Sequence, residues 1–170
     1  MTLLLGQLLA GWLLADFLGG VLHWLQDRVL SPRLPILGRL LVQPQRLHHD
    51  QPLAFTGGGI VKRNWSTWAA TALVGTAWLL LLGPSVILGV AAVGGMLSSQ
   101  AHYWAHCPKA APVLVRVLQD TGLLQSPKGH ARHHRPPQDA SYCPLTDLIN
   151  PILHGIGLWA AVERLVRLGR

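Results

Sequence analysis

Eight of the nine histidines lie in four short groups along the chain. One group also contains an aspartate, and the four are His23 with Asp27, His48 with His49, His102 with His106, and His130 with His133 and His134. Imidazole is the commonest metal ligand in proteins. So many imidazoles in a chain of 170 residues predict a cluster of more than one metal ion.

The spacing inside the groups fits metal ligands carried by helices. Residues four apart share a helical face, so His23 with Asp27 can bind one ion, and so can His102 with His106. Adjacent residues diverge, so the pairs at 48–49 and 133–134 suit two neighbouring metals, or one ligand and one residue that orients it. A donor set of nitrogen and oxygen favours iron, manganese, zinc or Cu(II) over an iron–sulfur cluster or Cu(I).

The elements that must position these groups are apolar stretches, and each group lies at the edge of one or in a loop between two. A first helix is expected over residues 3–26, which suffices for a crossing of about 20 residues. From Asn64 to Pro108 the chain has no Lys, Arg, Asp or Glu, and Gly83-Pro84 divides this stretch. Helices are therefore expected at about 65–82 and 85–106.

A fourth apolar stretch, Leu145–Val166, is expected to span as well, with a half-buried helix in the bilayer interface as the alternative. Asp16 is expected to face the interior of the bundle, because a charged group inside a bilayer is costly. The sequence thus predicts an all-α integral membrane protein with about four transmembrane helices, forming one domain over residues 1–170.

Composition supports a membrane protein over a soluble one. Half of the residues are apolar and only 12% are charged, against about 25% in soluble domains. The net charge of +7 avoids the apolar stretches, so anionic lipid and membrane topology explain it better than nucleic acid. Cys107 and Cys143 form no CxxC pair, and the apolar N-terminus is interpreted as a retained span.

The basic residues predict the orientation. Eleven of the fourteen lie in the loops 27–64 and 107–144, which share one side if there are four spans. The positive-inside rule makes that side cytoplasmic and places both termini opposite. All four histidine groups then converge on the cytoplasmic face, a position suited to redox chemistry on an apolar substrate. His154 has no histidine or acidic partner three or four residues away and is left out of the site.

Four stretches together resemble the Kua-type lipid desaturases, the plasmanylethanolamine desaturase-like family. They are Asp16-Phe-Leu-Gly-Gly-Val-Leu-His-Trp-Leu-Gln-Asp27, His48-His-Asp-Gln-Pro52, Gln100-Ala-His-Tyr-Trp-Ala-His106 and His130-Ala-Arg-His-His-Arg-Pro136. The similarity continues through Tyr142-Cys143 to Asn150 and Glu163. Departures are Gly129, where family members often have a second histidine, and Pro137-Gln138, where they often have one more.

The resemblance implies a membrane di-iron enzyme that uses O2 to remove two hydrogens from an alkyl or acyl chain of a phospholipid. The product could be the vinyl ether of plasmalogens. The metal ligands would be drawn from the eight grouped histidines, with Asp27 as a ligand or an orienting residue. No flavin, NAD or haem motif is present, so electrons would come from a separate cytochrome b5-like protein or ferredoxin.

Two alternatives stay open. A di-iron lipid hydroxylase would use the same residues and insert oxygen where a desaturase removes the second hydrogen. A non-catalytic membrane metal-binding protein would place polar groups along a path through the bilayer, whereas only Asp16 and His154 lie deeper here. A membrane protease is disfavoured, because the chain has neither HExxH nor GxSxG.

Overall fold

The computed structural model describes residues 1–168, and within them every regular element is a helix. The all-α prediction is therefore confirmed. The elements are α1 (Thr2–Trp24), η1 (Leu25–Val29), η2 (Gly38–Val42), α2 (Gln43–Asp50), α3 (Ile60–Leu82), α4 (Val86–His106), η3 (Pro108–Ala110), α5 (Val113–Asp120), α6 (Pro127–His133), α7 (Asn150–Gly155) and α8 (Leu158–Leu168). Both η1 and η2 are π-helical turns.

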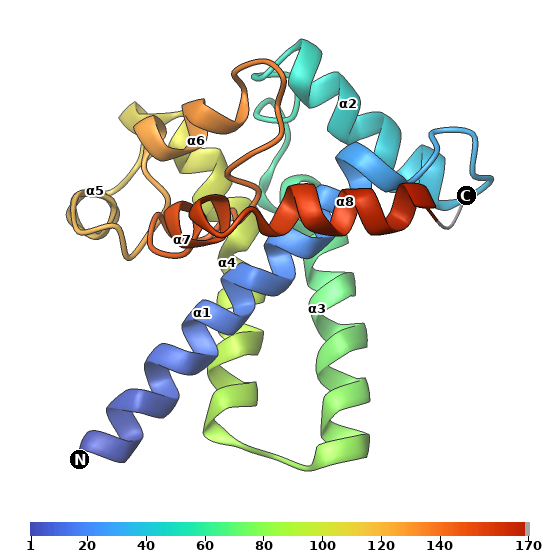
Figure 1. Cartoon of the computed structure of the whole chain (residues 1–170). Helices are drawn as coiled ribbons and strands as arrows, with labels where there is room; N and C mark the ends of the chain where they lie inside the picture. The colour runs from blue at the N-terminus through green and yellow to red at the C-terminus, as the bar shows by residue number, and fades with distance from the viewer. Residues whose placement is uncertain (169–170) are drawn as a thin grey trace.

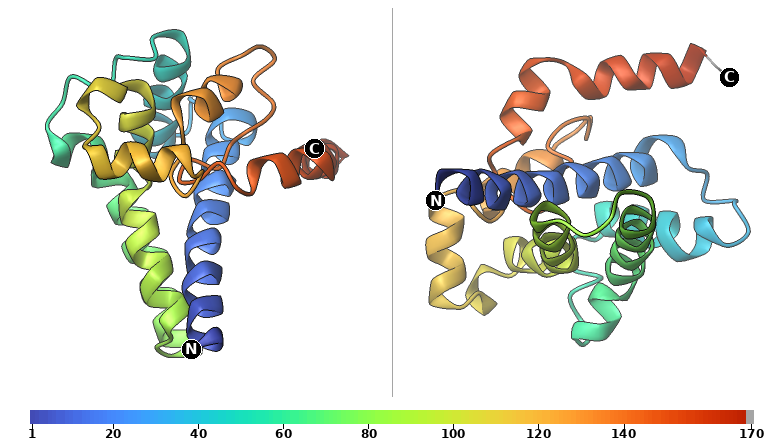
Figure 2. Two further views of the ribbon diagram at one scale, coloured as in Figure 1. Left: turned by 90° about the vertical axis from the view of Figure 1, so that its left-hand side faces the viewer. Right: turned by 90° about the horizontal axis from the view of Figure 1, so that it is seen from below.

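Three long helices, α1, α3 and α4, form a stem, and residues 25–59 and 107–168 form a head at one end of it (Figure 1). α4 packs against both α1 and α3. The N-terminus and the α3–α4 turn both lie at the end of the stem away from the head, as the left view in Figure 2 also shows. All side chains of the head therefore lie at one end of the stem.

The surface of the stem is apolar. Leu80 and Leu81 are about four-fifths exposed, and the one buried residue of α3 is Asn64. Two segments, Thr2–Val29 and Ile60–Leu82, are long and apolar enough to cross a bilayer. α4 is of similar length, but Ser98, Gln100 and His102 lower the mean hydropathy of its second half. Exposed leucines in such continuous rows fit a lipid environment rather than water.

The expected fourth span is wrong. Residues 145–149 form an irregular, bent connection, and the rest of the stretch folds into α7 and α8, of 6 and 11 residues. At about 1.5 Å per residue, α8 covers only about half of a bilayer core of about 30 Å. Gly157, with a φ of 66°, separates the two helices. α8 lies across the stem, as the interfacial alternative predicted (Figure 1, Figure 2).

Buried aromatic contacts hold α8 in that position. Trp159 is 5% exposed and lies against Trp24 and Tyr142, with ring centroids 6.0 and 5.1 Å away. α8 thus docks on the end of α1 and cannot extend along the stem. The described C-terminal end consequently lies beside the head, at the other end of the stem from the N-terminus, whereas the sequence analysis expected both termini on one side.

Asp16 faces the interior as expected, but its partners belong to the head. The buried carboxylate accepts hydrogen bonds from the Leu145 backbone N–H, at 2.8 Å, and from the Thr146 hydroxyl. At two glycines near this junction, a neighbouring segment packs so closely that no larger side chain would fit. A Cβ at Gly20 would lie 2.5 Å from Cys143 Sγ, and one at Gly94 would lie 2.7 Å from the Ala15 Cβ. Asp16 therefore fastens the connection 141–149 to the stem.

Candidate metal centre

All nine predicted residues meet where the head joins the stem, and they divide into two groups. Group A is His48, His102, His106, His130 and His134, and group B is His23, Asp27, His49 and His133. Within each group the donor atoms all lie within 4.8 Å of one another. Segments far apart in the sequence therefore converge on two adjacent points.

The division follows the helical spacing. Each adjacent pair is split, because His48 and His134 belong to group A whereas His49 and His133 belong to group B. Each pair four residues apart stays together, and these pairs are His23 with Asp27, His102 with His106, and His130 with His134. Neighbouring side chains on a helix point about 100° apart, so one helix can serve two centres. Of the two explanations for the adjacent pairs, two neighbouring centres fit this structure.

Five elements supply the residues. The last turn of α1 carries His23, and the π-helical turn that continues it carries Asp27. The last turn of α2 supplies two histidines, α4 supplies His106 from its last turn and His102 from the turn before, and α6 with its C-cap residue supplies three. Helix ends pointing at one region leave the backbone regular while the side chains converge.

Distances in group A are those of ligands around one cation. His48 Nε2 lies 2.9 Å from His102 Nε2 and 3.1 Å from His134 Nε2. His130 Nε2 similarly lies 2.6 Å from His106 Nε2 and 2.9 Å from His134 Nε2. Two nitrogens at right angles around an ion, each at about 2.1 Å, would be about 3 Å apart. Because each ring nitrogen has either one proton or one lone pair, hydrogen bonds alone do not satisfy so many mutual contacts.

Two backbone carbonyls orient two of the imidazole rings of group B. His23 Nδ1 donates to the Tyr142 carbonyl and His133 Nδ1 to the Ala140 carbonyl, each at 2.9 Å. A carbonyl can only accept, so the proton of each neutral ring is on Nδ1 and the Nε2 lone pair faces the centre. Asp27 Oδ2 lies 3.2 Å from His49 Nε2 and 3.3 Å from His133 Nε2. The group therefore combines three imidazoles with one carboxylate.

The environment keeps three imidazoles of group A neutral. Burial, and then the neighbouring imidazoles, lower the pKa of His134 to about 3 and hold the pKa values of His48 and His130 well below the usual range. The neutral ring is the form that binds a metal. The buried Nδ1 atoms of these three residues have no hydrogen-bond partner, so packing alone orients their rings.

The donor set fits an oxygen- and nitrogen-binding metal. Neither cysteine belongs to either group, and Cys143 is buried against Gly20. Iron, manganese, zinc and Cu(II) are compatible with such donors. Five donors in group A and four in group B exceed the need of one tetrahedral zinc. The residues present thus fit a pair of metal ions.

Sequence reasoning missed two residues of the site. Gln45 Nε2 lies 2.8 Å from His23 Nε2 and 3.2 Å from His49 Nε2. Its position four residues before His49 on α2 was the available signal. Phe55 meets the rings of His48 and His102 edge-on, with centroids 4.8 and 5.1 Å away. No sequence pattern predicted Phe55 as part of the site, because the loop 51–59 has no helical periodicity.

Other residues singled out in the sequence lie outside both groups. His154 is in α7 and exposed, in agreement with its omission from the site. Asn150 clamps the backbone of Cys143, with hydrogen bonds of 3.0 and 2.8 Å. Glu163 pairs with Arg28 at 2.8 Å and with Arg167. The Arg28–Glu163 contact joins α8 to η1 and supports the docking of α8 beside Asp27, whereas the Arg167 contact lies within α8.

Comparison with known proteins gives a consistent result. Residues 12–169 match the lipid desaturase domain family. A probable fatty acid desaturase of Acanthamoeba polyphaga mimivirus is 30% identical, over 94% of this chain and 80% of its own length. Plasmanylethanolamine desaturases of Myxococcus xanthus and Mus musculus are each 32% identical, over 96% and 93% of this chain.

The chain spans about three-fifths of the length of those last two relatives, 60% and 63%. No solved structure matches the chain significantly. The names of the relatives confirm the expectation of a desaturase-type oxidoreductase, and the apolar stem agrees with membrane association. With its matched domain and converging histidines, the chain belongs to the lipid desaturase family, as its resemblance to the Kua-type enzymes predicted.

Proposed function

We propose that this protein is a membrane di-iron lipid desaturase that removes two hydrogens from an alkyl or acyl chain of a phospholipid. The observation that carries the proposal is the pair of adjacent donor groups at the end of an apolar stem. Group A would hold one iron and group B the other. When bound, the irons would supply the O2-dependent redox chemistry that removes hydrogen from an unactivated CH2, which side chains cannot perform.

The chain's own residues prepare this site. The carbonyls of Tyr142 and Ala140 keep the protons of His23 and His133 on Nδ1. The Tyr142 hydroxyl donates to the Gln138 carbonyl at 3.0 Å, and burial raises the pKa of this phenol, so the hydroxyl stays protonated. Phe55 covers group A and helps to exclude water. These contacts fix the ligands before substrate arrives, which reduces the reorganisation that the reaction requires.

The substrate would approach along the stem. α1 and α4 expose apolar side chains over most of their length and end in His23, His102 and His106. A lipid tail lying against these helices would reach the metal groups at the point where the head begins. Since two relatives are named plasmanylethanolamine desaturases, an ether phospholipid and a vinyl ether product are the first candidates to test.

We further propose that the head faces the cytoplasm. With three stem helices, all Lys and Arg among the described residues lie in the head or, for Lys62 and Arg63, in the first turn of α3 beside it. The positive-inside rule favours the cytoplasm for such a side. Electrons would come from a separate cytochrome b5-like protein or ferredoxin that docks on this basic head.

Lipid mass spectrometry of cells with and without the protein tests the function. Desaturation predicts a phospholipid lighter by two hydrogens, and acid-labile if it is a vinyl ether, together with about two irons per purified chain. A product heavier by one oxygen would instead establish a hydroxylase. If the protein binds metal but forms no lipid product when an electron donor is present, it would be a non-catalytic metal-binding protein.

Variants tie that activity to the site. His133→Ala should abolish product and reduce the iron content while the protein stays in the membrane, because it removes a buried donor of group B. His154→Ala is the matched control, since this exposed histidine belongs to neither group. Full activity and full iron content in His133→Ala would overturn the assignment.

A further inference from the structure

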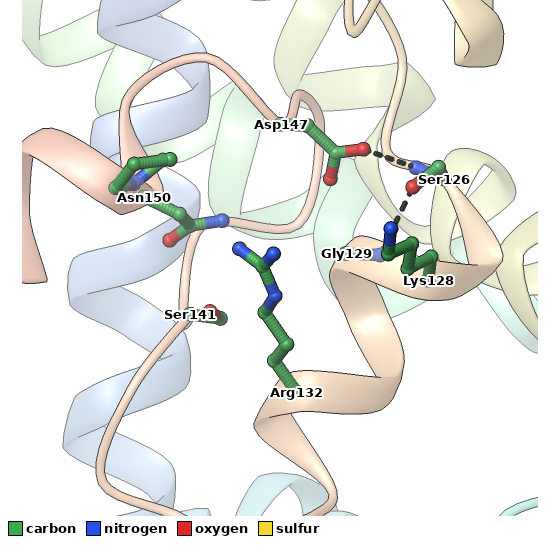
Figure 3. A pocket seen from close by; sticks show the side chains of 8 residues that line it. Ser126, Lys128, Gly129, Arg132, Ser141, Asp147 and Asn150 are labelled. Carbon is green, nitrogen blue, oxygen red and sulfur yellow. Dashed lines mark hydrogen bonds between the residues drawn. The ribbon is translucent and has the colours of Figure 1, made fainter.

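A small polar cavity lies on the outer side of α6. Ser126, Lys128 and Arg132 line it from the side of α6, and Ser141, Asp147 and Asn150 from the facing segment (Figure 3). Its volume of about 190 Å³ is smaller than the roughly 300–1,000 Å³ of sites that enclose a drug-sized molecule. The cavity therefore suits one polar group rather than a whole lipid.

The cavity and the metal groups use different faces of α6. Lys128 and Arg132 are four apart and share one face. His130 and His134 are also four apart, and their offset of two residues turns them about 200° from the first pair. The cavity is thus separate from groups A and B, although α6 contributes residues to the cavity as well as to the two groups.

The side chains that line the cavity have a net positive charge that suits a ligand with one negative charge. Among the described residues, Lys128 and Arg132 form no ion pair and no side-chain hydrogen bond. Figure 3 shows the guanidinium of Arg132 turned into the space between α6 and the facing segment. Asp147 already accepts a hydrogen bond from the Ser126 backbone N–H at 3.1 Å. Two cations and one carboxylate leave a net charge of +1, and Arg and Lys are the usual partners of phosphate oxygens.

The surroundings of the cavity place it at a bilayer surface. Asn150, at the start of α7, lines it, and the following residues Ile152 and Ile156 are 61% and 68% exposed. Leu148, just before, is exposed too. A bilayer that surrounds the stem would cover these apolar side chains, which leaves the adjacent cavity in the layer of lipid phosphates. α6 lies above α7 on the same side of the head (Figure 1).

We propose that this cavity binds the phosphodiester of a phospholipid headgroup and holds a boundary lipid against α6. Because the cavity lies on the side of α6 away from His130 and His134, this lipid is separate from the one whose tail would reach the metals. The inference goes beyond the proposed function and does not depend on turnover. Its consequence is structural, since the bound lipid fastens the helix that presents His130 and His133.

Thermal unfolding of the full chain in a neutral detergent tests this site. The probes are dioctanoylphosphatidylglycerol, dioctanoylglycerol, which has the same tails without phosphate, and inorganic phosphate. Dioctanoylphosphatidylglycerol at ten times its dissociation constant should raise the unfolding midpoint by about 3–6 °C. The Lys128→Gln/Arg132→Gln double variant should lose this shift. The Arg33→Gln/Lys109→Gln double variant, which removes the same charge from exposed positions elsewhere in the head, should keep it.

The contrary outcomes are distinct. An undiminished shift in the Lys128→Gln/Arg132→Gln variant would overturn the site, and an equal shift with dioctanoylglycerol would show that only the tails bind. An equal shift with inorganic phosphate would replace the lipid headgroup by a free anion. If the double variant does not fold, the single exposed change Lys128→Gln should weaken binding of dioctanoylphosphatidylglycerol about tenfold, and unchanged binding would overturn the proposal.

Discussion

At the residue scale, the position of single protons prepares the site for metal. The carbonyls of Tyr142 and Ala140 can only accept, and so they direct the Nε2 lone pairs of His23 and His133 into group B. Group A has no such hydrogen bonds at the Nδ1 atoms of His48, His130 and His134. The two groups therefore orient their rings differently, group B partly by hydrogen bonds and group A by packing.

Gln45 is the residue whose role is most open to test. Its amide contacts His23 and His49, and the ring of His23 can only accept there, so the amide donates at 2.8 Å. In a metal-loaded group B, where these lone pairs would bind the ion, the Gln45 amide would instead have to present its oxygen and would then help to hold the ion or orient its ligands. We expect Gln45→Ala to weaken metal binding in group B by about 10–100-fold, the usual cost of losing an orienting partner.

Metal titration of the purified apoprotein, followed by metal analysis after dialysis, measures this effect. Gln45→Glu, which keeps an oxygen at the same position, should retain the metal, and Gln51→Ala, at the exposed end of α2, serves as the control. Equal retention of both metals by Gln45→Ala and the parent protein would show that Gln45 only fills space.

At the scale of elements, the metal groups depend on how the segment 138–149 is held. This segment provides both carbonyls that orient group B, and it has no helical hydrogen bonds of its own. Asp16 of α1 holds it through Leu145 and Thr146. A carboxylate inside a candidate membrane helix thus serves the geometry of the head rather than a path for ions.

Replacing Asp16 should therefore disturb stability and site together. Asp16→Ala leaves the buried Leu145 N–H without a partner, at a cost of about 1–3 kcal/mol, and the Thr146 hydroxyl adds a similar loss. We expect the midpoint of thermal unfolding in detergent to fall by about 4–24 °C and the iron content to decrease. Asp139→Ala is the control, because Asp139 is exposed in the same segment. A midpoint equal to that of the parent would show that the Asp16 contacts are dispensable.

At the scale of the whole molecule, the stem has three long helices, an odd number of crossings if all three span. The N-terminus and the α3–α4 turn then lie on one side of the membrane, with the head and the described C-terminal end on the other. This arrangement unites the basic residues Arg164 and Arg167 of α8 with those of the head loops. More of the basic residues therefore lie on one side of the membrane than in a four-span arrangement.

Reporter fusions distinguish the two arrangements. With three spans and a cytoplasmic head, a C-terminal reporter that is active only in the cytoplasm should be active, and the same reporter inserted between Gly83 and Pro84 should be inactive. Insertion after Gly57, in an exposed head loop, should give activity and is the control. Four spans would make the C-terminal fusion inactive. Activity at Gly83 with inactivity at Gly57 would reverse the orientation.

The sequence by itself determined the helical content and which nine residues converge into the two donor groups at one end of the stem. These properties follow from local patterns: apolar length sets the long helices, and spacing of four residues sets which side chains share a face. The same spacing explains why both residues of the pairs 23 and 27, and 102 and 106, entered one group.

Only the tertiary structure decided which distant pairs share a group, the place of Gln45 and Phe55, and the fate of residues 145–168. Distances between segments that are far apart in the chain have no local signature in their residue types. An apolar stretch can satisfy its side chains in lipid or against other residues, and here Trp159 docks on Trp24 and Tyr142. That contact, with the break at Gly157, turned an expected span into two short helices at the junction of head and stem.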